Sequence, residues 1–203
     1  MKHYGIVLCI ALFLAACGDS KPPAATSGKA PDTKAKAADN TLALKAGGKD
    51  LTMDVKSAIM RVSEQKASEP KNSHAKYLFV LMNYESTQGS DMSKTLSNPA
   101  DVRVAFNLLG PATSGKETPL APGTYSTEGQ WPKFDNSQYA IITVADGKQV
   151  VVMGQDFPDN ATKGEVKITS VADDTVKGEI NIVTADKNAI KGSFTAKIKP
   201  LNY

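Results

Sequence analysis

The feature that most constrains the fold is an alternation of apolar and polar residues with a period of two. In residues 102–109 the alternating sets are Val102, Val104, Phe106 and Leu108 against Arg103, Ala105, Asn107 and Leu109. Leu51, Met53 and Val55 repeat the pattern. Because successive side chains of a strand point to opposite faces, we expect strands with one face on a core and the other toward water.

Two short glycine-containing segments predict hairpin turns. Asp146-Gly147-Lys148 separates apolar runs at residues 139–145 and 149–153, and Gly47-Gly48 separates residues 42–45 from 51–55. Such turns need residues that tolerate a positive φ, and glycine does so without steric cost.

Two further runs concern the middle of the sheet. Residues 77–82 are apolar on both faces, which predicts a central strand. Residues 57–65 suit either a turn of helix or a strand, since Ile59, Met60 and Val62 fit both periods.

A 14-residue repeat occupies the C-terminal part. Lys163-Gly164-Glu165-Val166-Lys167-Ile168 returns from Lys177 as KGEINI and, more loosely, from Lys191 as KGSFTA. The period is too short for a solenoid unit, so we expect three adjacent strands joined by tight turns. The predicted core residues are Val166, Ile168, Ile180, Ile182 and Phe194, with Lys177 on the opposite face. This ending loosely resembles the C-terminal meanders of uncharacterised bacterial lipoproteins.

The predicted fold class is all-β. Counting the runs gives roughly eight to ten strands, which suits an antiparallel β-sandwich or a small barrel with a C-terminal three-strand meander. We expect a single β domain over residues 42–203, long enough to bury about two-thirds of the surface of its unfolded chain.

The N-terminus carries a distinct signal. A basic start with Lys2 and His3 precedes an apolar run, and the run ends in Leu14-Ala15-Ala16-Cys17. These features are typical of a secretory signal, and the last four residues resemble the lipobox of bacterial lipoproteins. The resemblance implies a signal peptide at residues 1–16, a lipid on Cys17 and attachment to a membrane. Because Gly18 rather than Asp follows Cys17, it also implies the cell envelope, with the outer membrane facing the periplasm favoured.

Residues 17–41 are predicted to be a lipid-anchored linker. Residues 18–41 are rich in Ala, Pro, Lys, Ser and Thr and contain no large apolar side chain, so they are expected to be disordered. A coil of this length reaches roughly 27 Å on average. Its function would be to hold the domain away from the membrane.

Few side chains suit catalysis or metal binding. The chain has two cysteines, and Cys9 would leave with the signal while Cys17 would be lipidated. Only His74 would remain of the two histidines, in a polar stretch where a solvated surface position is expected. No metal site, no cofactor and no catalytic residue is therefore predicted.

Two loops resemble ligand sites. Residues 110–117, GPATSGKE, approach a phosphate-binding loop, but Glu117 replaces the hydroxyl and Pro119 forbids the following helix, so nucleotide binding is not expected. Residues 156–160 offer oxygen ligands, but Asp, Pro and Asn are also ordinary turn residues, and a turn is expected.

Four aromatic residues around a Pro- and Gly-rich segment form the candidate binding site: Tyr125, Trp131, Phe134 and Tyr139. They could form a contact surface for an envelope protein or glycan, or fill one end of the core.

The 24 basic and 21 acidic residues are interspersed, so no nucleic-acid partner is predicted. The expected function is a non-enzymatic binding or scaffold module. The alternatives are an inhibitor of a lysozyme or protease that uses a protruding loop, residues 86–99 or 126–134, and a carboxylate-dependent envelope hydrolase.

Overall fold

A computed structural model describes residues 39–65, 72–86, 96, 98–112, 114–115, 118–128, 133–134, 140–144, 148–153 and 162–198. Contacts divide the chain into Met1–Ala35 and Lys36–Tyr203, and every described residue lies in the second unit. The described residues contain strands and no α-helix, which confirms the all-β prediction. The twelve strands form one connected sheet.

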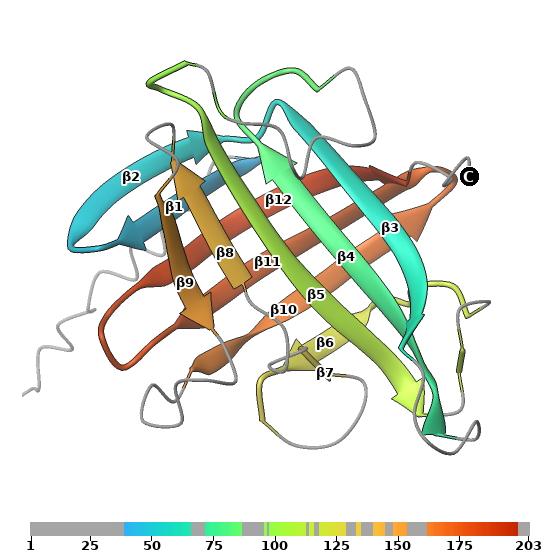
Figure 1. Ribbon diagram of the computed structural model, residues 1–203. Helices are drawn as coiled ribbons and strands as arrows, with labels where there is room; N and C mark the ends of the chain where they lie inside the picture. Colours follow the sequence, from blue (N-terminus) through green and yellow to red (C-terminus); the bar gives the residue numbers. More distant parts are fainter. Residues whose placement is uncertain are drawn as a thin grey trace, which may run out of the picture. The chain divides into compact units, whose positions relative to one another are not determined.

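Eight strands pair in a closed ring (Figure 1). In ring order they are β3 (Ser57–Gln65), β4 (His74–Met82), β5 (Val102–Ala112), β7 (Lys133–Phe134), β6 (Gly123–Ser126), β10 (Lys163–Ala172), β11 (Thr175–Val183) and β12 (Ala189–Ile198). The ring closes because β12 pairs with both β11 and β3. The pairs β3–β12 and β6–β7 are parallel, whereas all other described pairs are antiparallel.

Two hairpins branch from the ring. β1 (Thr41–Ala46) and β2 (Lys49–Asp54) attach through β12, and β8 (Ala140–Val144) and β9 (Gln149–Met153) attach through β5. Both hairpins were predicted at these positions, and Gly47 and Gly48 take the positive φ that the first turn requires. The strands that the sequence did not predict are β6 and β7, in the Pro- and Gly-rich segment.

The C-terminal repeat forms the predicted meander. β10 pairs antiparallel with β11, and β11 with β12. The five predicted core residues, Val166, Ile168, Ile180, Ile182 and Phe194, are at most 2% exposed. Lys177 is exposed on the opposite face, so the predicted register is confirmed.

The core lies between the meander and β3, β4 and β5, which cross in front of it in Figure 1. Phe79 of β4 stacks on Phe106 of β5 with ring centroids 5.0 Å apart, and Phe194 of β12 packs edge-on against both rings. β4 is buried along most of its length, as a central strand requires, and residues 57–65 form a strand rather than a helix.

The prediction that β5 turns one face to water is wrong. Arg103, Asn107 and Leu109 are at most 7% exposed, although they point away from the main core. Their face of the sheet continues into a second apolar cluster formed by Ile59, Val80 and Met82. The outer face of β5 therefore adjoins buried apolar surface, and alternation in the sequence cannot reveal that.

Candidate functional site

The predicted aromatic site maps to the end of the ring where β6 and β7 lie (Figure 1). Tyr125 in β6 is 2% exposed, and Phe134 in β7 is fully buried. Both side chains thus belong to the core and offer no ring to a partner. Trp131 and Tyr139 lie outside the described residues, as does Cys17.

Phe134 extends the aromatic stack of the core to this end of the ring. Its ring lies 6.0 Å from that of Phe106, nearly parallel to it. Its strand contributes two residues, which pair with Leu108 and Leu109 of β5. The buried ring and this short pairing fix the chain immediately after residue 132.

The other end of the same loop is also fixed. The Thr127 amide donates a hydrogen bond to the Gly164 carbonyl at 3.0 Å, and the Glu128 amide donates to Ser126 Oγ at 3.1 Å. Ser126 and Lys133 then pair as neighbours in parallel strands. Residues 127–132, the β6–β7 loop, therefore connect two fixed points, and Trp131 belongs to this loop.

Two buried tyrosines hold the adjacent β5–β6 connection, residues 113–122. The Tyr77 hydroxyl donates to the Thr118 carbonyl at 2.9 Å, and the Tyr125 hydroxyl donates to the Ala121 carbonyl at 3.0 Å. Burial raises the pKa of the Tyr77 hydroxyl, and the nearby Tyr125 adds to the rise. Burial also raises the pKa of Tyr125, against the opposing effect of its hydrogen bond to Ala121. These two hydrogen bonds hold backbone carbonyls of the connection against the buried tyrosines of the ring.

The segment that resembles a phosphate-binding loop is part of this connection. Gly110 is buried within β5, and Ser114 Oγ accepts a hydrogen bond from the Ala75 amide at 2.9 Å. The Ser114 amide donates to the Pro111 carbonyl at 3.2 Å. Lys116 and Glu117 lie outside the described residues. The Ser114 hydroxyl thus bonds to the backbone of β4, and the Ser114 amide bonds within the segment itself.

His74 is not the solvated surface residue that the polar sequence around it predicted. It is the first residue of β4, pairs with Gln65 and Ala112, and is 8% exposed. The strand begins earlier than its apolar run, and pairing on both sides buries the side chain.

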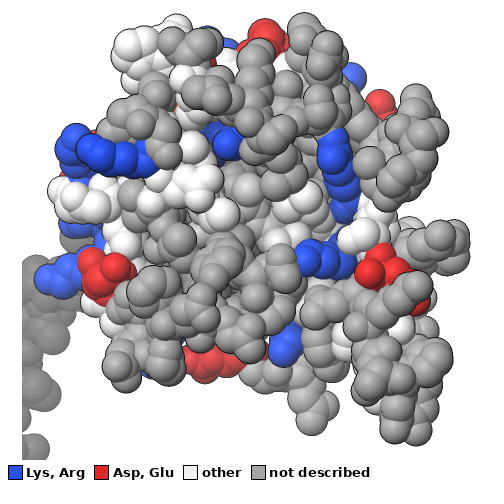
Figure 2. Space-filling model, viewed as in Figure 1, with Lys and Arg blue, Asp and Glu red and all other residues white. Residues whose placement is uncertain are grey.

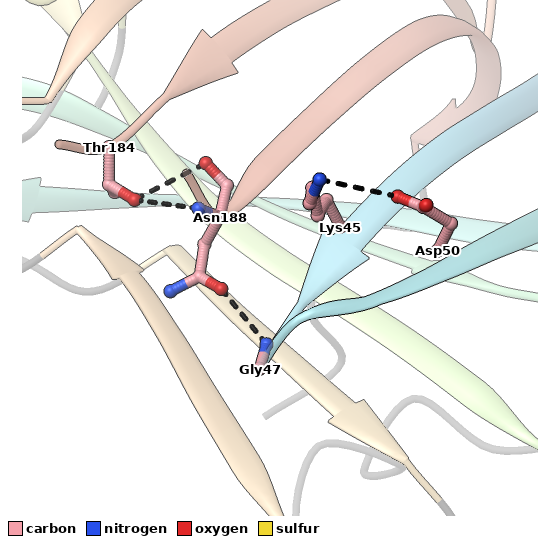
Figure 3. Close-up of polar contacts among 5 residues, drawn as sticks. All are labelled: Lys45, Gly47, Asp50, Thr184 and Asn188. Carbon is pink, nitrogen blue, oxygen red and sulfur yellow. Dashed lines mark hydrogen bonds and ion pairs between the residues drawn. The ribbon is translucent and has the colours of Figure 1, made fainter. Parts of the chain in front are cut away.

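A polar cluster that sequence reasoning missed lies at the β11–β12 turn (Figure 3). Thr184 Oγ1 accepts a hydrogen bond from the Asn188 amide at 3.0 Å, and Asn188 Oδ1 accepts one from the Gly47 amide at 2.9 Å. Thr184 and Asn188 are both buried, and the bond to Gly47 attaches the β1–β2 hairpin to the turn. A nearby ion pair, Lys45–Asp50 at 3.9 Å, spans that hairpin. Threonine and asparagine flanking a turn were the available sequence signal.

Charges of both signs are interspersed over the face shown in Figure 2. Within the described ranges no three histidine, cysteine, aspartate or glutamate side chains gather as a metal site would require. The same part of the chain contains no helix long and apolar enough to cross a membrane. Residues 156–160 lie outside it. No family model, curated protein or solved structure matches this chain.

Proposed function

We propose that this chain is a lipid-anchored envelope protein whose β domain binds or scaffolds an envelope component without catalysing a reaction. The β6–β7 loop, with Trp131, is the proposed contact. The observation that carries this proposal is the fixation of both loop ends, by the Thr127–Gly164 hydrogen bond and by the buried Phe134. A loop held on a rigid scaffold loses little conformational entropy when it binds.

The proposed anchor is a lipid on Cys17, following cleavage after Ala16. Its support is the coincidence of a basic start, an apolar run and Leu14-Ala15-Ala16-Cys17. We place the protein in the cell envelope, with the outer membrane facing the periplasm as its site.

For the scaffold itself we infer a small barrel rather than a two-layer sandwich. The closed ring of eight paired strands supports this choice, since a sandwich has sheet edges between its layers. The rings of Phe79 in β4 and Phe194 in β12, two strands apart in the ring, approach to 5.5 Å, and both side chains are buried in the interior.

A second candidate function is inhibition of an envelope hydrolase by the β4–β5 connection. Its described ends are firmly held: Asn83 Nδ2 donates to the Ala100 carbonyl at 2.8 Å, and the Val102 amide donates to Asn83 Oδ1 at 2.7 Å. The Ala100 amide also donates to Asn98 Oδ1 at 3.0 Å. Inhibitory loops depend on such preorganisation.

The contact is tested by Trp131→Ala in the full chain, with Lys116→Ala as control. Loss of a tryptophan hot spot weakens binding by about 2 kcal/mol or more, roughly thirtyfold. We therefore expect weaker capture of the envelope partner at an unchanged melting temperature, whereas Lys116→Ala alters neither. A large fall in melting temperature for Trp131→Ala would place the ring in the core and contradict the proposed contact.

The anchor is tested separately by Cys17→Ser. We expect this variant to lose labelling by a palmitate analogue in growing cells and to retain its signal peptide, since the serine hydroxyl does not replace the thiolate. Normal processing of Cys17→Ser would instead indicate an ordinary secretory signal.

A further inference from the structure

The outer face of the C-terminal meander gathers lysines that are far apart in the sequence. Five of them are exposed on it: Lys163, Lys167, Lys177, Lys191 and Lys197. They share one face because the residues between them, such as Val166, Ile180 and Phe194, are buried on the other. We call this surface the lysine face.

The lysine face carries a net positive charge. Only Glu165 and Glu179 oppose the five lysines on these strands, and the remaining acids of the meander lie in its two turns. The outer residues that adjoin the face on β6, Thr124 and Ser126, are uncharged. Among the described residues no ion pair neutralises any of the five lysines at short range.

The chain that leads to the proposed anchor enters the domain beside this face. The Asn40 amide donates to Ser193 Oγ at 3.1 Å, and Asn40 Oδ1 accepts from the Thr195 amide at 2.8 Å. Ser193 and Thr195 stand between Lys191 and Lys197 along β12. The described part of the chain therefore begins at the border of the lysine face, and Cys17 lies among the 38 residues that precede it in the sequence.

We propose that the lysine face docks the domain on the anionic phospholipid headgroups of the membrane that holds the Cys17 anchor. This inference depends on the proposed lipid anchor. Charge complementarity and the exit point of the linker both favour this orientation. Each lysine near an anionic membrane contributes attraction equivalent to about a fivefold gain in binding. The anchor supplies attachment, and the lysines select which side of the domain faces the lipid.

The test measures how closely the face approaches the lipid. The full chain is purified from membranes with Asn181→Cys, an exposed position opposite Glu165 and Lys191, and is labelled there with a fluorophore. Proteoliposomes contain a headgroup nitroxide quencher in either neutral phosphatidylcholine or a mixture with about 30% phosphatidylglycerol. A label at Ala100→Cys, exposed just before β5 and so across the ring from β11, is the reference.

We expect strong quenching at residue 181 only in the anionic vesicles and little at residue 100. The triple variant Lys167→Gln, Lys177→Gln, Lys191→Gln should lower the quenching at residue 181 severalfold, as should about 0.5 M salt. The charge-matched control Lys49→Gln, Lys56→Gln, Lys148→Gln replaces exposed lysines elsewhere and should leave it unchanged.

Equal quenching at the two labels, or equal effects of the two triple variants, would contradict the proposed docking through the lysine face. Failure of the anchor has a different signature, because the chain would then not float with neutral vesicles and Cys17 would accept the label. In that case salt-sensitive flotation with the anionic vesicles, weakened only by the first triple variant, would still support the face.

Discussion

At the scale of single residues, the second position of each 14-residue copy is a glycine, and the structure gives the physical reason for it. Gly164 and Gly192 both take positive φ, at 130° and 140°, where the backbone of the next strand lies close. A Cβ at Gly164 would lie 1.9 Å from the Asn181 carbonyl oxygen. At Gly178 a Cβ would instead meet the Phe194 ring at 2.7 Å. The repeat therefore encodes close approach of strands as well as alternation.

Gly192→Ala should destabilise the fold by about 3 kcal/mol or more, because its Cβ would lie 2.1 Å from the Thr41 carbonyl oxygen and the sheet would have to separate. Gly47→Ala is the matched control: its φ is also positive, but no atom lies within 4 Å of the added Cβ. It should cost about 1 kcal/mol from backbone strain alone. Urea unfolding compares the two, and equal costs would contradict the close contact.

At the scale of elements, local pairing was predictable and ring closure was not. Asp-Gly and Gly-Gly between apolar runs specified both hairpins, and the repeat specified the meander. The parallel pair β3–β12 joins segments far apart in the sequence, and no local pattern encodes it. For the same reason the burial of Arg103 on an outer face was missed.

The candidate site was predictable only in part. Aromatic residues around a Pro- and Gly-rich segment were the sequence signal for the candidate site, but composition does not say which rings point inward. Tyr125 and Phe134 alternate into the core because they lie in short strands, and that follows from tertiary pairing. The fixed ends of the β6–β7 loop likewise depend on Gly164, which is distant in the sequence.

The closure of the ring depends on a fork in β12, and Asn40 occupies it. β12 pairs with β1 up to Gly192 and with β3 from Lys197 onward. Between these points Asn40 Oδ1 accepts from the Thr195 amide at 2.8 Å, and its Nδ2 donates to the Val55 carbonyl. One side chain thus joins β12 to the β2–β3 connection at the point where β1 and β3 diverge.

Asn40→Gly should cost about 2 kcal/mol, since it removes two side-chain hydrogen bonds while keeping the positive φ of 68° accessible. Asn40→Ala should cost about 1 kcal/mol more, because alanine also disfavours that φ. The exposed neighbour supplies the control, and Asp39→Ala should change the unfolding free energy by less than about 0.5 kcal/mol. If all three substitutions were equally mild, the bridge would not stabilise the fork.

At the scale of the whole molecule, one apolar core joins every strand of the ring. A destabilising change at either end of the ring should therefore lower the free energy of global unfolding. The main apolar cluster extends from Leu42 in β1 to Ala196 in β12. Tyr77 and Tyr125 belong to this cluster and also hold the β5–β6 connection through their hydroxyls. Their ionisation should therefore be coupled to unfolding of the entire domain.

This coupling predicts a fall in stability at high pH. Burial raises the pKa of both hydroxyls above the ordinary value of 10.0, so the folded state keeps protons that the unfolded state releases. The contribution is fully present below about pH 10 and declines above it, because the unfolded state then releases tyrosine protons that the folded state keeps. Tyr77→Phe with Tyr125→Phe should lower the free energy of unfolding at pH 7 by about 2 kcal/mol, through two lost hydrogen bonds. The same double variant should flatten the decline above pH 10, because phenylalanine has no hydroxyl proton to release. Urea unfolding from pH 8 to 11 measures the difference, and parallel curves for the two proteins would show that these hydroxyls ionise without unfolding the domain.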